Sequence, residues 1–145
     1  MYKFNIRRTF DPEDVDRQTR KCMEDLPCFW PADWVAYEKN YALIDDHDNI
    51  GLLDYKAPGI YEPHLYFSDR GREALARATA MIAWTFDNTD AKELRGQTPI
   101  LCKGAWWLVR KIGFKRTGLI QTDFSPAYAS VMTREMWEER QAIDQ

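Results

Sequence analysis

The chain has 145 residues, of which 45% are hydrophobic and 30% are charged, and its formal net charge is -3. This length and composition predict one globular domain over residues 1–145. The small negative charge gives no general attraction to nucleic acid or to anionic membranes. Three cysteines without metal-ligand spacing predict a reduced, intracellular protein rather than a disulfide framework. No apolar run approaches the length of a membrane span, so we expect a soluble protein.

The beginning of the chain predicts a strand, a helix and an aromatic loop. Residues 2–8 alternate apolar and polar side chains, as a half-buried strand does. Asp11 and Pro12 predict the start of a helix, which must end before Pro27. The aromatic stretch 28–34 is interpreted as a hydrophobic plug over the core, and the alternative is that it forms one wall of a substrate cleft.

Residues 37–44 and 49–55 predict a β-hairpin. Its turn runs from Asp45 to Asp48 and also contains His47. Consecutive carboxylates at a turn usually face solvent, so we expect an acidic, solvated turn rather than a metal site.

The stretch from Gly59 to Asp87 predicts the central unit of the fold, a strand followed by a turn and a long helix. The strand covers residues 60–67, with Glu62 and His64 on one face and Tyr61, Leu65 and Phe67 on the other. After a Ser-Asp-Arg-Gly turn, the helix from Arg72 carries an apolar stripe at Leu75, Thr79, Ile82 and Phe86. The free N–H groups at its start can meet a phosphate, and the alternative is a corner that binds nothing.

The last third of the chain predicts a strand over residues 92–98 and a helix that Gly113 closes. The apolar face of this helix consists of Ala105, Leu108, Val109 and Ile112, so Trp106 should lie partly on the surface. Two more strands, 114–118 and 127–132, precede a helix that Thr133 caps and that carries Met136 and Trp137. Together these elements predict a mixed α/β layer fold with one sheet.

This order of elements resembles the GNAT superfamily of acyl-CoA-dependent N-acetyltransferases over nearly the whole chain. Arg70-Gly71-Arg72 opens the central helix, and Lys111-Ile112-Gly113-Phe114 closes the second one. The chain is most similar to GNAT-like proteins of bacteriophages, which share a Tyr-x-x-His-x-x-Phe strand and a Thr-Arg-acid-x-Trp segment, here Tyr61 to Phe67 and Thr133 to Trp137. The resemblance implies a central mixed sheet with helices on both faces. The strand over 60–67 should splay away from the strand that follows Lys92.

The resemblance also implies acetyl-CoA as the cofactor. In that superfamily its pyrophosphate rests on the backbone amides of an Arg/Gln-x-x-Gly-x-Gly/Ala turn, where glycine leaves room for the phosphates. The matching cofactor-binding residues here are Leu65, Phe67, Arg70, Gly71, Arg72, Glu73 and Ala74. Glu73 and Leu75 replace the two small residues, and the Glu73 carboxylate would stand beside a phosphate. We therefore expect binding to be weakened rather than lost.

The resemblance to the GNAT superfamily also implies a base on the central strand, and we expect Glu62 to be this base, with His64 supporting or orienting it. The alternative is that both side chains are structural. Cys102 stands where the superfamily usually has Asn, and Val109 where it often has the Tyr that protonates the leaving thiolate. Cys102 is either a nucleophile or, as is more usual for a single cysteine, a small buried residue.

Two functions follow as expectations. One is an acetyl-CoA-dependent N-acetyltransferase that acts on a primary amine of a small molecule, a lysine or an N-terminus. The other is a catalytically inactive GNAT-like bacteriophage protein with a structural, virion-assembly or host-interaction role, in which Trp106 marks a self-association or partner site. Either would act in the host cytoplasm, or in the virion, without a metal.

Overall fold

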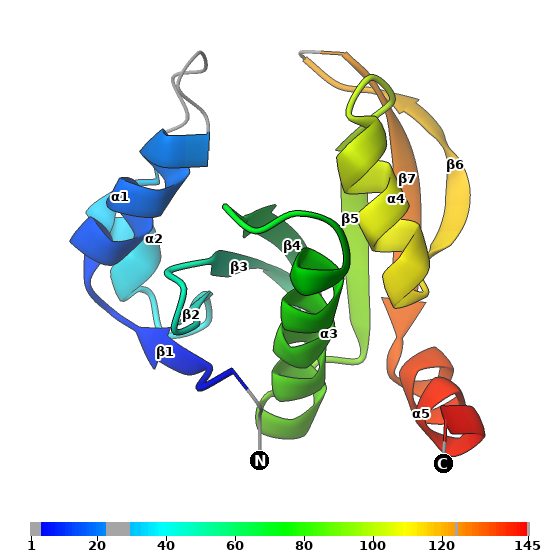
Figure 1. Cartoon of the computed structure of the whole chain (residues 1–145), viewed down its shortest axis with the longest axis horizontal. Coiled ribbons are helices and arrows are strands. Elements are labelled where there is room, and N and C mark those ends of the chain that lie inside the picture. The colour runs from blue at the N-terminus through cyan, green and yellow to red at the C-terminus, as the bar shows by residue number, and fades with distance from the viewer. Residues whose placement is uncertain (1–3, 23–29, 124, 145) are drawn as a thin grey trace.

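The computed structural model describes residues 4–22, 30–123 and 125–144 and contains one seven-stranded sheet with the strand order β1-β2-β3-β4-β5-β7-β6 (Figure 1). The strands are β1 (Arg7–Thr9), β2 (Tyr41–Ile44), β3 (Ile50–Ala57), β4 (Ile60–Tyr66), β5 (Glu93–Pro99), β6 (Lys115–Gln121) and β7 (Pro126–Thr133). The helices are α1 (Pro12–Cys22), α2 (Ala32–Ala36), α3 (Gly71–Asn88), α4 (Lys103–Ile112) and α5 (Arg134–Asp144). The predicted mixed α/β fold is confirmed. Among the described residues, no helix has both the length and the apolar composition that a membrane crossing needs.

The centre of the sheet is a parallel pair that opens along its length. β4 and β5 pair in parallel only at Ile60 with Glu93 and at Tyr61 with Leu94, whereas the other neighbouring strands are antiparallel. Beyond these two positions the two strands diverge, as the sequence analysis expected. α3 begins at Gly71, just after β4 ends, and lies across this region of the sheet (Figure 1).

Helices cover the two faces of β4 with separate apolar clusters. Tyr61 and Phe67 belong to the larger cluster under α3, together with Ala78, Ile82 and Leu94. Tyr66 belongs to a second cluster formed with α1 and α2, whose members include Val15, Val35, Ile44 and Leu52. Since side chains alternate along a strand, Glu62 and His64 lie on the face of Tyr66. The predicted division of this strand into two faces is therefore confirmed.

The Thr-Arg-acid-x-Trp segment joins the last helix to the C-terminal end of α3. Thr133 caps α5 as predicted, because its Oγ1 accepts a hydrogen bond from Met136 N at 3.1 Å. The Arg134 guanidinium donates to the carbonyls at that end of α3, those of Phe86 (2.7 Å), Ala91 (2.9 Å) and Thr89 (3.2 Å). Trp137 stacks on Phe86 with ring centroids 6.0 Å apart. Arg134 and Trp137 thus fix α5 against the end of α3.

Two expectations about packing are wrong, those for Ala105 and Thr79. Ala105 is exposed, because the first turn of α4 extends beyond the core and burial begins at the second turn. Leu75 packs on the main core cluster as expected, but Thr79 is only half-buried, whereas Arg77 is buried with 4% of its surface exposed. The inner face of α3 contains Ile82 and Phe86 as predicted, together with Ala74, Ala78, Met81 and Thr85. α3 therefore turns a charged side chain inward, toward the β2–β3 turn.

Candidate active site at the splayed strands

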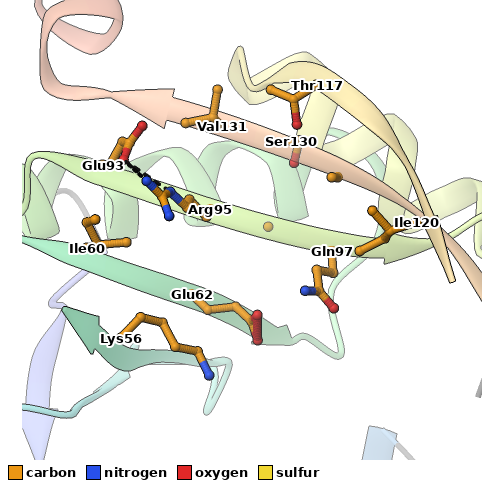
Figure 2. Close-up of a pocket in the computed structure, with 12 residues that line it drawn as sticks. Lys56, Ile60, Glu62, Glu93, Arg95, Gln97, Thr117, Ile120, Ser130 and Val131 are labelled. Carbon is orange, nitrogen blue, oxygen red and sulfur yellow. Dashed lines mark hydrogen bonds and ion pairs between the residues drawn. The ribbon is translucent and has the colours of Figure 1, made fainter. Parts of the chain in front are cut away.

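The opening between β4 and β5 borders a hollow of about 550 Å³. Glu62 and Arg95 are the first residues after the last paired position, and both line the hollow with Lys56, Ile60, Glu93 and Gln97 (Figure 2). The opposite wall consists of residues of β6 and β7. A volume of this size lies within the range of small-molecule sites.

Glu62 and His64 lie together on the predicted face. His64 Nε2 is 3.0 Å from Glu62 Oε2, a contact between ionisable groups, and Nε2 has no hydrogen-bond partner in the described part of the chain. The pKa of Glu62 is lowered by the contact with His64 and by the charges of His64 and Lys56, which together outweigh its burial. Glu62 is therefore ionised at neutral pH and can accept a proton.

Aromatic side chains enclose this pair from the α2 side. The Trp30 ring lies 5.0 Å from the His64 ring and 4.7 Å from the Trp34 ring. Trp34 Nε1 donates to Asp54 Oδ1 at 2.9 Å, and Asp54 Oδ2 pairs with Lys56 Nζ at 2.9 Å. The two indoles also pack on the second core cluster. The described part of the aromatic loop thus both plugs the core and borders the candidate site, while Cys28 and Phe29 lie outside the described residues.

The predicted phosphate-binding turn lies at the start of α3. Gly71 has φ +60°, and a Cβ placed on it would meet nothing within 4 Å, so the turn is open. Within the described ranges, the backbone N–H groups of Gly71, Arg72 and Glu73 have no hydrogen-bond partner, and Arg70 supplies no side-chain cap. The Arg70 guanidinium instead donates to the carbonyls of Phe67 and Asp69. Unpaired amides at the positive end of a helix suit an anion.

The buried amide side chains of Asn49 and Gln18 bind the segment that leads from β4 to α3. Asn49, which is fully buried, accepts hydrogen bonds from the backbone N–H groups of Ser68 (2.8 Å) and Asp69 (3.5 Å). Its Nδ2 donates to Asp45 Oδ2 at 3.0 Å and to Asp69 Oδ2 at 2.7 Å. From α1, Gln18 Nε2 donates to the carbonyl of Tyr66 and to Ser68 Oγ. The exit from β4 is thus positioned by side chains of two other elements.

The prediction of a solvated acidic turn between β2 and β3 holds for Asp46, His47 and Asp48, which are exposed, but not for Asp45. The Asp45 side chain is fully buried and lies 3.1 Å from Arg77 Nη1, while Asp46 lies 2.7 Å from the same atom. Arg77 Nη2 is 3.0 Å from His47 Nε2, which must accept because a guanidinium only donates. Burial opposes the charge of Arg77, but its carboxylate partners raise its pKa above the ordinary value. The acidic turn therefore neutralises one buried arginine.

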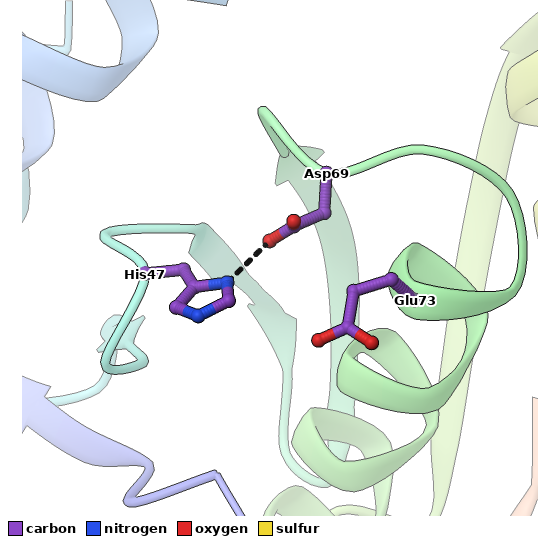
Figure 3. A group of neighbouring side chains, drawn as sticks. All are labelled: His47, Asp69 and Glu73. Carbon is purple, nitrogen blue, oxygen red and sulfur yellow. Dashed lines mark hydrogen bonds and ion pairs between the residues drawn. The ribbon is translucent and has the colours of Figure 1, made fainter.

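Glu73 belongs to the same network. Its Oε1 accepts from Arg77 Nε at 2.8 Å, and Figure 3 shows the carboxylate on the side of α3 that faces His47 and Asp69. The ligand atoms of His47, Asp69 and Glu73 lie within 4.8 Å of one another, but Arg77 already supplies their counter-charge. Glu73 is thus a paired carboxylate, so its repulsion of a phosphate is smaller than the sequence alone suggested.

The residues of α4 and its N-terminal cap that the sequence singled out, Cys102, Trp106 and Val109, differ in how deeply they are buried. Cys102 is exposed at the N-terminal cap of α4, which corrects the interpretation as a buried apolar residue, and Val109 is half-buried on the main core cluster. Trp106 is half-buried, partly on the surface as predicted, and its ring packs 4.7 Å from that of Tyr128. A partner site at Trp106 stays a prediction.

Sequence reasoning missed Arg95, Lys56 and Gln97 as site residues. Glu93, Arg95 and Gln97 alternate with Leu94 and Thr98 along β5, and this polar alternation was the available signal. It shows that one face of β5 is polar. It does not show that this face meets Glu62, because that depends on the pairing of β4 with β5.

The fold with its splayed central strands is that of the GNAT acetyltransferases. No protein-family model matches the chain, and no curated protein matches it. Among solved structures, the aminoglycoside acetyltransferase AAC(6')-Ib in complex with coenzyme A has a TM-score of 0.69 at 15% identity, over 94% of this chain and 98% of that chain. A mutant form of the spermidine/spermine N-acetyltransferase SpeG from Vibrio cholerae has a TM-score of 0.77 at 10% identity, over 96% and 98%. A GNAT-family acetyltransferase from Bacillus anthracis has 0.64 at 15%, over 92% and 98%. At these identities the similarity establishes the fold alone.

Proposed function

We propose that this protein is an acetyl-CoA-dependent N-acetyltransferase that acts on a primary amine. The observation that carries the proposal is the combination of two features at the splay. Unpaired backbone N–H groups open α3 just after β4 ends, and an ionised carboxylate, Glu62 of β4, lines the hollow between β4 and β5. AAC(6')-Ib, which has this fold, is crystallised with coenzyme A, and this supports a CoA-type ligand here.

The residues at the turn fit the pyrophosphate of such a ligand. The amides of Gly71, Arg72 and Glu73 would hold its oxygens, and the open space at Gly71 lets a phosphate approach the backbone. The Glu73 carboxylate weakens the site less than its charge suggests, because Arg77 pairs with it. When bound, acetyl-CoA supplies the activated acyl group.

The role of Glu62 in the reaction is to remove a proton from the acceptor. An amine is a nucleophile only when neutral, and Glu62 can take the proton from the ammonium form directly or through one water. The His64 imidazole lies close enough to stabilise the carboxylate and to fix its position. With Val109 in place of a tyrosine, the thiolate would take its proton from water.

Ligand binding and turnover test the proposal together. Acetyl-CoA at millimolar concentration should raise the melting temperature of the wild type, because a ligand of the folded state stabilises it by mass action. Arg72→Gln removes a positive side chain beside the amides that open α3 and should reduce this shift, whereas Lys111→Gln, which removes an exposed positive charge on α4, should not. Release of the CoA thiol with a panel of primary amines should then fall roughly a hundredfold or more in Glu62→Gln. If acetyl-CoA leaves the melting temperature unchanged and no amine releases thiol, the proposed activity is wrong.

The second candidate is a GNAT-like protein without catalysis. Val109 at the tyrosine position and Glu73 in the phosphate turn favour it. It predicts self-association or partner binding that Trp106→Ala removes, with no thiol release on the same samples. Sedimentation of the wild type and this variant measures the association directly.

A further inference from the structure

The hollow beside Glu62 carries a row of charged and polar side chains from β5. Glu93, Arg95 and Gln97 share one face of this strand and line the hollow. The parallel register pairs Tyr61 with Leu94, so its next step would place Arg95 beside Glu62, where the strands have begun to separate. Figure 2 shows Glu62 and Arg95 on two sides of the opening. A cation and a carboxylate thus face the same space from neighbouring strands.

Arg95 is the more exposed of the two cations that line this hollow. Its Nε and Nη2 both donate to one oxygen, Glu93 Oε2, at 3.1 and 2.9 Å, while Nη1 has no hydrogen-bond partner in the part of the chain that the structure describes. The Arg95 side chain is 60% exposed. Lys56 is less exposed, at 48%, and its Nζ lies 2.9 Å from Asp54 Oδ2. A guanidinium presents its N–H groups as a planar fork that matches carboxylate and phosphate oxygens.

We propose that Arg95 binds an anionic group carried by the acceptor, so that the acceptor is a small zwitterion whose amine lies at Glu62 and whose carboxylate or phosphate lies at Arg95. This inference rests on the proposed acetyltransferase function. The charges of the hollow agree with it, since Lys56 and Arg95 balance Glu62 and Glu93. A diamine could pair its second ammonium group with Glu93 only in competition with Arg95, whereas a zwitterion meets a complementary charge at each end.

Acceptors of equal length but different charge test this proposal. The aminocarboxylates β-alanine, γ-aminobutyrate and ε-aminocaproate are compared with the matching alkylamines and with putrescine and cadaverine. Phosphoethanolamine distinguishes a phosphate from a carboxylate. In the wild type, kcat/KM should be about tenfold higher for the best anionic amine than for its uncharged counterpart, as one charge-assisted hydrogen bond supplies.

Two substitutions with opposite expected effects on the acceptor preference separate a loss of recognition from misfolding. Arg95→Gln should abolish the preference for the anionic acceptor, chiefly through KM. Glu93→Gln should strengthen the preference, because it removes the carboxylate that occupies Arg95. Lys111→Gln on α4 serves as the control that removes a cation elsewhere. Equal rates for charged and uncharged acceptors, or a preference that survives in Arg95→Gln, would overturn the proposal.

Acceptor binding measured without turnover keeps the two proposals distinct. Chemical-shift changes on titration with the same amines report the Arg95 site even if acetyl-CoA does not bind. Turnover without a preference for anions refutes the zwitterion and leaves the acetyltransferase. Arg95-dependent binding of aminocarboxylates without turnover supports the anion site and refutes the acetyltransferase. The absence of both refutes both.

Discussion

Asn49 tests whether the buried polar network holds the turn at which α3 begins. Its side chain is fully buried and makes four hydrogen bonds, two of them to the carboxylates of Asp45 and Asp69. Asn49→Ala leaves a buried carboxylate short of a donor and the Ser68 N–H without an acceptor. Hydrogen bonds to charged groups contribute about 1.5–3 kcal/mol each, so we expect a loss of about 3 kcal/mol in the free energy of unfolding. For a chain of 145 residues this corresponds to a fall of about 10 °C in melting temperature.

The assay is thermal and urea unfolding followed by circular dichroism, with acetyl-CoA binding measured on the same samples. Asn49→Asp keeps the size of the side chain but adds a negative charge between two carboxylates. It should be worse than Asn49→Ala at neutral pH and should recover in part on acidification. Gln121→Ala, which removes an exposed side chain bonded only to its neighbour's carbonyl, should change stability by about 0.5 kcal/mol or less. If Asn49→Ala matches this control, the network does not hold the turn.

Three further predictions concern the ends of α3 and the candidate base. Arg134→Met removes three hydrogen bonds to carbonyls at the end of α3 and should cost about 2–3 kcal/mol of unfolding free energy. Thr133→Ala, which removes the cap of α5, should cost about 1 kcal/mol. Equal losses for the two variants in urea titrations would contradict this prediction. Glu73→Gln keeps the bulk of the side chain but removes its charge, so acetyl-CoA should bind a few-fold more tightly by calorimetry. The same change removes a charged partner of Arg77 and should lower the melting temperature. Weaker acetyl-CoA binding would show that the paired carboxylate favours binding of the ligand. Because the pKa of Glu62 is lowered, kcat/KM should stay level as the pH falls to the ordinary carboxyl value of 4.5 and decline only below it. The contribution of this shift to the free energy of unfolding is present above pH 4.5 and is lost as the pH falls further. A fall in kcat/KM that begins above pH 4.5 would argue for another base.

The order of elements could be predicted because its signals are local. Alternation gave the face of Glu62 and His64, Pro12 marked the start of a helix, and Thr133 capped the last one. Each of these signals acts within a few residues of the chain. The splay of the central strands was expected from the family resemblance rather than from such signals.

The features that could not be predicted depend on residues distant in sequence. Arg77 reads as a surface residue of a helix until Asp45 and Asp69 meet it from two other segments. Arg95 reads as an ordinary polar strand residue, and only the register of β4 with β5 brings it beside Glu62. β4 and β5 are joined through α3 rather than by a tight turn, so no turn sequence fixes their register.

The position of β7 bears on how the chain folds as it is made. β7 lies between β5 and β6, yet its residues follow both of these strands in the sequence. The meander β1 to β4 can pair as it leaves the ribosome, but β5 has only its short contact with β4 until residue 126 emerges. Unpaired strand edges invite association with other chains. Translation that stops before Pro126 therefore leaves two strands with open edges, and the last strand made is the one that closes the sheet.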